Sequence, residues 1–63
     1  MINYRLETLT SWDEEETGLY YWNVKIYANY DFLKFYTGFL TRDEAERTGQ
    51  AFIDGIKFAR GES

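Results

Sequence analysis

The sequence predicts an α+β fold in which a three-stranded antiparallel β-sheet packs on one C-terminal α-helix. Two observations support this prediction. Apolar and polar residues alternate in two segments before residue 30, with the period of two that is typical of a strand, and an apolar run follows at residues 32–40. After residue 41 the apolar residues recur every three or four positions, as in an amphipathic helix. Because 63 residues can enclose only one small core, we expect a single domain over residues 1–63.

The first predicted strand spans about Ile2–Thr10, where Tyr4 and Leu6 alternate with Arg5 and Glu7. Ser11–Gly18 then interrupts the alternation with charged residues and ends in a glycine. This composition indicates a hairpin loop between the first and second strands.

The second predicted strand, Leu19–Asn29, has the most regular alternation and is rich in aromatic and β-branched residues. A tight turn around Tyr30 connects it to a third strand at Phe32–Leu40, so the sheet is predicted to be antiparallel. The register of the third strand is left open because both of its faces are apolar. We take three of its residues as inward, whereas a slip by one residue would turn Phe32 and Tyr36 inward instead. The inward residues are Leu33, Phe35 and Phe39.

The helix is predicted to begin at Thr41, because Thr41 and Glu44 have the spacing of a capping box. Gly61 follows Arg60 and is a suitable residue to end the helix. The apolar stripe that faces the sheet is predicted to contain Ala45, Gly49, Phe52, Ile53, Ile56 and Ala59.

Composition excludes several function classes. The chain has no cysteine and no histidine, so it can form neither a disulfide framework nor a zinc finger. It also lacks a glycine-rich phosphate loop and a nucleophile with a nearby base, and we therefore expect no enzymatic activity, no cofactor and no metal site. No apolar run reaches the length of a membrane span or a secretory leader, which predicts a cytoplasmic protein with no membrane partner.

The face of the sheet that a single helix cannot cover is predicted to be aromatic and basic. Such a face favours binding to a protein partner or to a second copy in a homodimer, because tyrosine and arginine are typical of protein interfaces. An alternative is that these residues only stabilise an exposed sheet through cross-strand pairs. The predicted partner-binding residues are Arg5, Tyr21, Lys25, Tyr27, Phe32, Lys34 and Tyr36, with Phe58 as an exposed contact on the helix.

An acidic segment lies in the first predicted loop and contains Asp13, Glu14, Glu15 and Glu16. It lacks the ligand spacing and central glycine of an EF-hand loop, so a solvated hairpin tip is the simplest interpretation. A second hypothesis is mimicry of nucleic-acid phosphates, as in a small inhibitor from a phage or mobile element that occupies a basic groove.

The second strand, the third strand and the start of the helix together resemble two families of DNA-binding domain. Trp22–Tyr27, Gly38–Leu40 and Thr41–Ala45 are similar to the corresponding parts of the arm-binding amino-terminal domains of tyrosine recombinases and of the plant AP2 domain. The resemblance covers about residues 19–60 and implies that the open sheet face enters the DNA major groove. Arg5, Lys25 and Lys34 would then contact phosphates, with Tyr21, Tyr27 and Tyr36 near base edges. A net charge of −4 disfavours nucleic acid as the partner.

Overall fold

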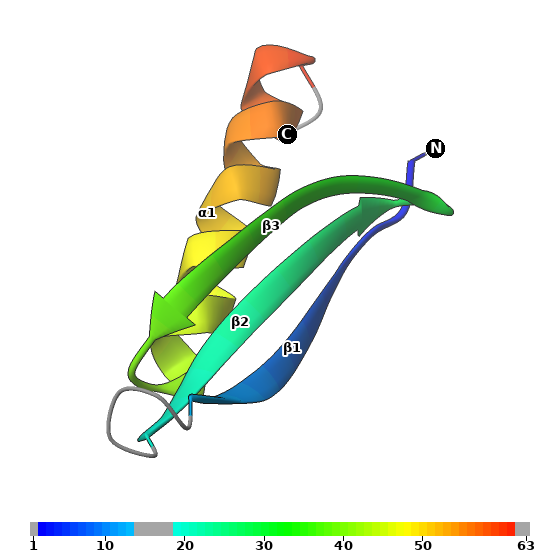
Figure 1. The fold of residues 1–63 in the computed structure, drawn as a ribbon. Helices are drawn as coiled ribbons and strands as arrows, with labels where there is room; N and C mark the ends of the chain where they lie inside the picture. The colour runs from blue at the N-terminus through cyan, green and yellow to red at the C-terminus, as the bar shows by residue number, and fades with distance from the viewer. Residues whose placement is uncertain (1, 14–18, 62–63) are drawn as a thin grey trace.

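A computed structural model of the chain describes residues 2–13 and 19–61. Its elements are β1 (Tyr4–Asp13), β2 (Leu19–Ala28), β3 (Asp31–Phe39) and α1 (Arg42–Ala59), in the order shown in Figure 1. The three strands form one antiparallel sheet in the order β1-β2-β3. The predicted α+β fold with a C-terminal helix is therefore confirmed.

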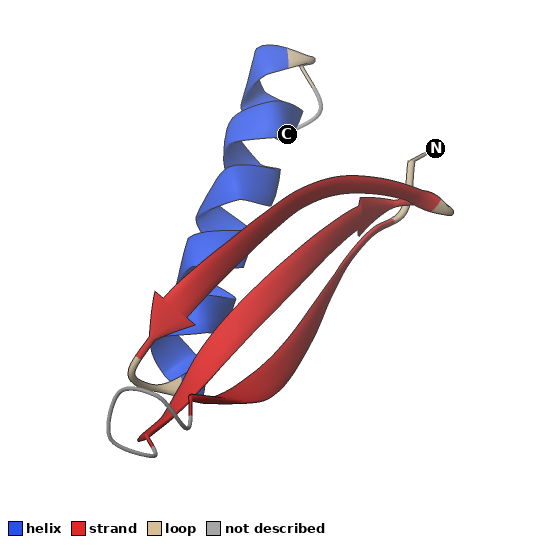
Figure 2. Ribbon diagram, viewed as in Figure 1, coloured by secondary structure: helices blue, strands red, loops and turns tan. Residues whose placement is uncertain are grey.

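The molecule has two layers, because α1 lies against one face of the sheet (Figure 2). It extends over 44 × 20 × 13 Å and has a radius of gyration of 13.4 Å. A compact globule of this length would have a radius of about 10.6 Å, so the domain is elongated along its strands. In the described part of the chain no second layer covers the other face of the sheet.

Strand β1 begins and ends later than the sequence predicted, at Tyr4 and Asp13 instead of Ile2 and Thr10. Ser11–Asp13, predicted as the start of the loop, continues β1 and pairs with residues 19–21 of β2. The backbone groups of this segment have partners in the ladder, and this outweighs the turn preference of Ser11 and Asp13. The second hairpin is tight, as expected, and Asn29 has the positive φ of 56° that such turns require.

Strand β3 contains two β-bulges that the sequence analysis did not anticipate. The register with β2 shifts between Ile26 and Tyr27 and again between Trp22 and Val24, and each shift places one additional residue in β3. The first additional residue is Leu33, and the second bulge contains Gly38 with a φ of +90°. Each bulge reverses the alternation of the side chains that follow it.

The bulges make part of the predicted orientation of β3 wrong. Tyr36 lies opposite Val24, and Lys34 lies opposite Ile26, so both side chains are on the helix side of the sheet. Phe35 lies opposite Lys25 on the uncovered side, and Leu33 is exposed in the bulge rather than inward. Because the orientation changes within the strand, neither of the two uniform registers considered from the sequence is correct.

The core is small and lies between β2 and the helix. Its buried apolar residues are Val24, Ile26, Ala45 and Ile53. Phe52 extends it by an edge-to-face contact with Tyr36, with ring centroids 6.0 Å apart. The predicted helical stripe is confirmed at Ala45, Gly49 and Ile53, whereas Ala59 at the end of the helix is exposed. Tyr4, Leu6, Trp22 and Phe39 also pack against this core.

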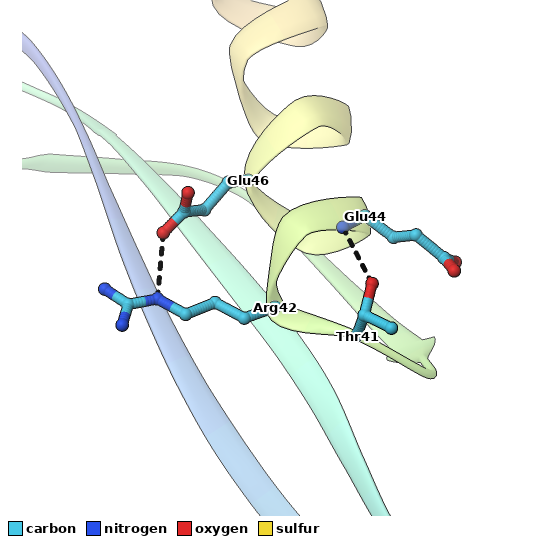
Figure 3. Close-up of polar contacts among 4 residues, drawn as sticks. All are labelled: Thr41, Arg42, Glu44 and Glu46. Atoms are coloured by element: carbon cyan, nitrogen blue, oxygen red, sulfur yellow. Dashed lines mark hydrogen bonds and ion pairs between the residues drawn. The ribbon is translucent and has the colours of Figure 1, made fainter.

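Both ends of α1 are capped by local interactions. Figure 3 shows the Thr41 hydroxyl accepting a hydrogen bond of 3.2 Å from the backbone N–H of Glu44, so the predicted cap is confirmed. The same figure shows the ion pair between Arg42 and Glu46, one turn apart on the helix. Gly61, with a φ of 73°, ends the helix after Arg60, as predicted. In the part of the chain that the structure describes, no helix is long and apolar enough to cross a membrane.

Gly49 allows the helix to approach the sheet closely. A Cβ atom added at Gly49 would lie 2.7 Å from Leu6 Cδ2 and 3.0 Å from Val24 Cγ2. Both distances are shorter than a normal van der Waals contact, and Val24 is fully buried and cannot move aside. Gly55 lies on the same helix, and a Cβ added there would meet no atom within 4 Å.

We therefore expect opposite effects from the same substitution at these two glycines. Gly49→Ala should lower the free energy of unfolding by about 1–2 kcal/mol, because overpacking outweighs the helix propensity of alanine. Gly55→Ala should raise it by roughly 0.5–1 kcal/mol, because only the propensity term acts. Urea denaturation followed by circular dichroism measures both effects. Equal stabilisation by the two substitutions would contradict the close packing of α1 on β1 and β2.

Candidate interaction face

The face of the sheet opposite α1 is here called the open face. Its residues follow from the strand register, because directly paired residues of antiparallel strands project to the same side. They form cross-strand rows, and the rows alternate with those that pack toward the helix. The open face consists of Arg5, Glu7, Leu9, Ser11, Tyr21, Asn23, Lys25, Tyr27, Phe32, Phe35 and Thr37.

One row of the open face is an ordered aromatic and cationic cluster. The rings of Tyr27 and Phe32 meet edge to face, with centroids 5.9 Å apart. The guanidinium of Arg5 lies 4.1 Å from the centroid of the Tyr27 ring, within the range of a cation–π interaction. Arg5 also forms an ion pair with Glu7, with 3.8 Å between Nη1 and Oε2. These contacts hold the side chains in place while Phe32 keeps 56% of its surface exposed.

The next row crosses the sheet from Glu7 through Lys25 to Phe35. Phe35 is 43% exposed although it is a large apolar side chain. Its ring and that of Phe32 lie on the same side because the bulge at Leu33 separates them. The two phenylalanines form an exposed apolar pair on the open face, flanked by the charges of Arg5, Glu7 and Lys25.

A polar network joins all three strands in the row that contains Asn23. The Asn23 side chain is 2% exposed and is the buried polar residue of the described chain. Its amide nitrogen donates to Ser11 Oγ at 2.7 Å, and its amide oxygen accepts from the hydroxyl of Thr37. Donor and acceptor are thus both satisfied, so this buried amide favours one alignment of the three strands.

The structure brings together most, but not all, of the predicted binding residues. Five of them, Arg5, Tyr21, Lys25, Tyr27 and Phe32, lie on the open face. The expectation that Lys34 and Tyr36 join them is wrong. The ammonium of Lys34 lies 5.4 Å from the Tyr36 ring centroid, and both side chains are on the helix side.

This correction changes the charge of the open face. The sequence predicted three cations there, whereas the strand register leaves Arg5 and Lys25, together with the anion Glu7. Because Arg5 is already paired with Glu7, the face is close to neutral. Its aromatic character is kept, since Phe35 takes the position that Tyr36 was predicted to occupy.

Phe58 is exposed, as predicted, but belongs to a different surface. It lies in the last turn of α1 and keeps 84% of its surface exposed. Tyr30, at the tip of the second hairpin, is 97% exposed and is also separate from the open face rows. A single flat partner on the open face would therefore not contact Phe58.

The acidic segment lies largely outside the described residues. This applies to Glu14, Glu15 and Glu16, and to the side chain of Asp13. The helix carries further acidic residues, of which Asp43 and Glu46 form ion pairs of 2.9 Å with Arg47 and Arg42. Among the residues that the structure describes, no three acidic side chains are grouped in a way that could hold a metal ion.

Comparisons with known proteins give no relative. No protein-family profile, no curated protein and no solved structure matches this chain. The resemblance to recombinase arm-binding and AP2 domains therefore stays a prediction.

Sequence reasoning missed two parts of the open face. Phe35 was assigned to the core because strict alternation was assumed along β3. The network around Asn23 was missed because Ser11 was predicted to lie in a loop. Gly38 was an available signal for the second bulge, since an isolated glycine within a strand often marks a bulge, but it does not signal the bulge at Leu33.

We expect the Asn23 network to be important for stability. Ser11→Ala removes the acceptor of a buried amide and should lower the free energy of unfolding by about 1–3 kcal/mol. Thr10→Val is the matched control, because it removes a hydroxyl from the adjacent, exposed position of β1 and should change stability by less than about 0.5 kcal/mol. Both values are obtained from urea denaturation. Similar small effects for the two variants would show that the network does not stabilise the sheet.

Proposed function

We propose that this protein is a non-enzymatic interaction domain, of the adaptor or inhibitor type, that binds a partner protein through its open face. The observation that carries the proposal is the exposure of Phe32 and Phe35 on a sheet face held in place by ordered contacts. Clusters of aromatic side chains with a neighbouring arginine are typical of the central part of protein interfaces.

The surface area of the chain supports this proposal. Its accessible surface is 4832 Å², whereas a compact monomer of 7.5 kDa would expose about 4,250 Å². The excess of roughly 600 Å² is comparable with the ~800 Å² that one partner contributes to a standard interface. An elongated sheet with one uncovered face contributes to this excess.

The charge of the open face favours protein over DNA as the partner. Phosphate neutralisation supplies most of the affinity of a DNA-binding domain and needs several cations on the contact surface. Here Lys34 projects to the helix side, and Arg5 interacts with Glu7 and Tyr27. Lys25 is then the remaining cation of the open face without an ion-pair partner among the described residues.

We expect a photo-cross-linking phenylalanine analogue to capture the partner protein from position 35 but not from position 58. Both residues are exposed phenylalanines, so the analogue is a conservative replacement at either position. Phe35 lies on the open face, whereas Phe58 lies on the helix. Cross-linking in the cells from which the protein comes, followed by mass spectrometry, identifies the captured protein. Capture from position 58 alone would contradict the proposal.

The purified partner then allows a quantitative test. Phe35→Ala should weaken binding by about tenfold or more, as truncation of a central apolar contact does, and Phe58→Ala should leave the affinity unchanged. Fluorescence anisotropy with duplex DNA at low and high salt is the second arm. Duplex binding that is lost in Lys25→Glu and decreases steeply with salt would replace this proposal with the DNA-binding alternative.

A further inference from the structure

At the outer edge of β1, alternate residues direct their backbone groups away from β2. In the described part of the sheet, β1 is bonded to β2 on one side and to no strand on the other. The backbone N–H of Asn29 donates a hydrogen bond of 2.7 Å to the C=O of Asn3, so Asn3 directs its carbonyl group toward the partner strand. Every second residue after Asn3 then bonds to β2. Because the register from there to the end of β1 is continuous, Leu6, Thr8 and Thr10 direct their N–H and C=O groups outward.

The two edges of the sheet differ in their protection against pairing. The outer strand β3 contains two bulges, a glycine with positive φ and a lysine, and these features discourage the addition of another strand. In contrast, β1 pairs with β2 over ten residues without a bulge and contains no lysine, proline or glycine. A long, regular edge of this kind is a template for a further strand. In Figure 1 this edge faces away from α1.

We propose that β1 pairs with the β1 strand of a second copy of this chain. A two-fold axis perpendicular to the sheet would bring the two identical edges together in antiparallel orientation. The sheet would then continue through six strands, with both helices on one side and both open faces on the other. This inference concerns the edge of the sheet and does not depend on the proposed function of the open face.

Charge restricts the register of this pairing. An axis at Glu7 would place two Glu7 carboxylates directly opposite each other, which is destabilising. An axis nearer the start of β1 would bring together the two helix ends, where Lys57 and Arg60 contact Tyr4 in each copy. An axis at Thr8 would place the charge of Glu7 opposite Leu9.

An axis at Leu9 avoids these conflicts. It places Leu9 opposite Leu9 of the second copy and Glu7 opposite the neutral Ser11, so an apolar pair forms and the two Glu7 carboxylates are kept apart. The two Tyr4 residues, and with them the cationic helix ends, would be separated by about 33 Å along the strands. The backbone groups of Leu9 bond to β2, so the Leu9 pair is of the close type, with Cα atoms about 4.5 Å apart.

Sedimentation equilibrium over a range of protein concentrations tests the pairing. The wild-type protein should form dimers as the concentration rises. Thr8→Pro removes an outward N–H from each copy without removing a bond to β2, and it should weaken dimerisation by about tenfold or more. Phe35→Ala, on the open face, should leave dimerisation unchanged. A monomer at every concentration, or a dimer lost in Phe35→Ala but kept in Thr8→Pro, would overturn the proposal.

Disulfide formation tests the register in a chain that has no natural cysteine. Leu9→Cys should form a disulfide-linked dimer under mild oxidation, because its two Cα atoms would be within bonding range. Glu7→Cys should not, since these residues would be about 13 Å apart. Tyr30→Cys, at the most exposed aromatic position among the described residues, reports the rate of random collision. Cross-linking of Leu9→Cys no faster than Tyr30→Cys would refute the Leu9 axis.

Discussion

The structure depends on one constraint, which is that a single helix can cover only one face of the sheet. The contact is close because Gly49 lets the helix backbone approach Leu6 and Val24. Val24 and Ile26 of the central strand are fully buried beneath it, while the outer strands contribute partly buried side chains. This small core leaves the other face to be stabilised by its own cross-strand contacts. The cross-strand contacts of the open face are therefore needed for the stability of the fold, whether or not the face binds a partner.

The two bulges of β3 decide what the open face contains. Without the bulge at Leu33, Phe35 would face the helix and Lys34 would lie on the open face, giving a more basic and less apolar surface. With it, Tyr36 turns inward and packs on Phe52, which enlarges the core at the edge strand. The same irregularity thus improves the packing on one side and concentrates phenylalanine on the other. Core packing and the composition of the open face are thus coupled through the geometry of one strand.

The sequence predicted the element order, the helix caps and the orientation of β2, because these features follow from periodic patterns and local capping chemistry. It failed where tertiary pairing overrides the local pattern. Ser11 was placed in a loop, but pairing with β2 and the hydrogen bond from Asn23 keep it in a strand. Nothing in the residues around Leu33 distinguishes a bulged strand from a regular one. Five of the predicted binding residues therefore lie on the open face as expected, whereas Phe35 required the register.

Pairing of two β1 edges would determine how the two open faces are arranged in the dimer. A two-fold axis perpendicular to the sheet keeps the two open faces on the same side, so a dimer would present two copies of the aromatic cluster to one partner surface. A bivalent contact of this kind gains affinity without additional contacts in each copy, provided that the spacing of the partner sites matches. It would also cover the outer edge of β1, to which no described strand is bonded and which is a template for non-specific strand addition. An elongated domain with a small core would in this way obtain part of its stability from its own second copy, since association stabilises the folded state by mass action.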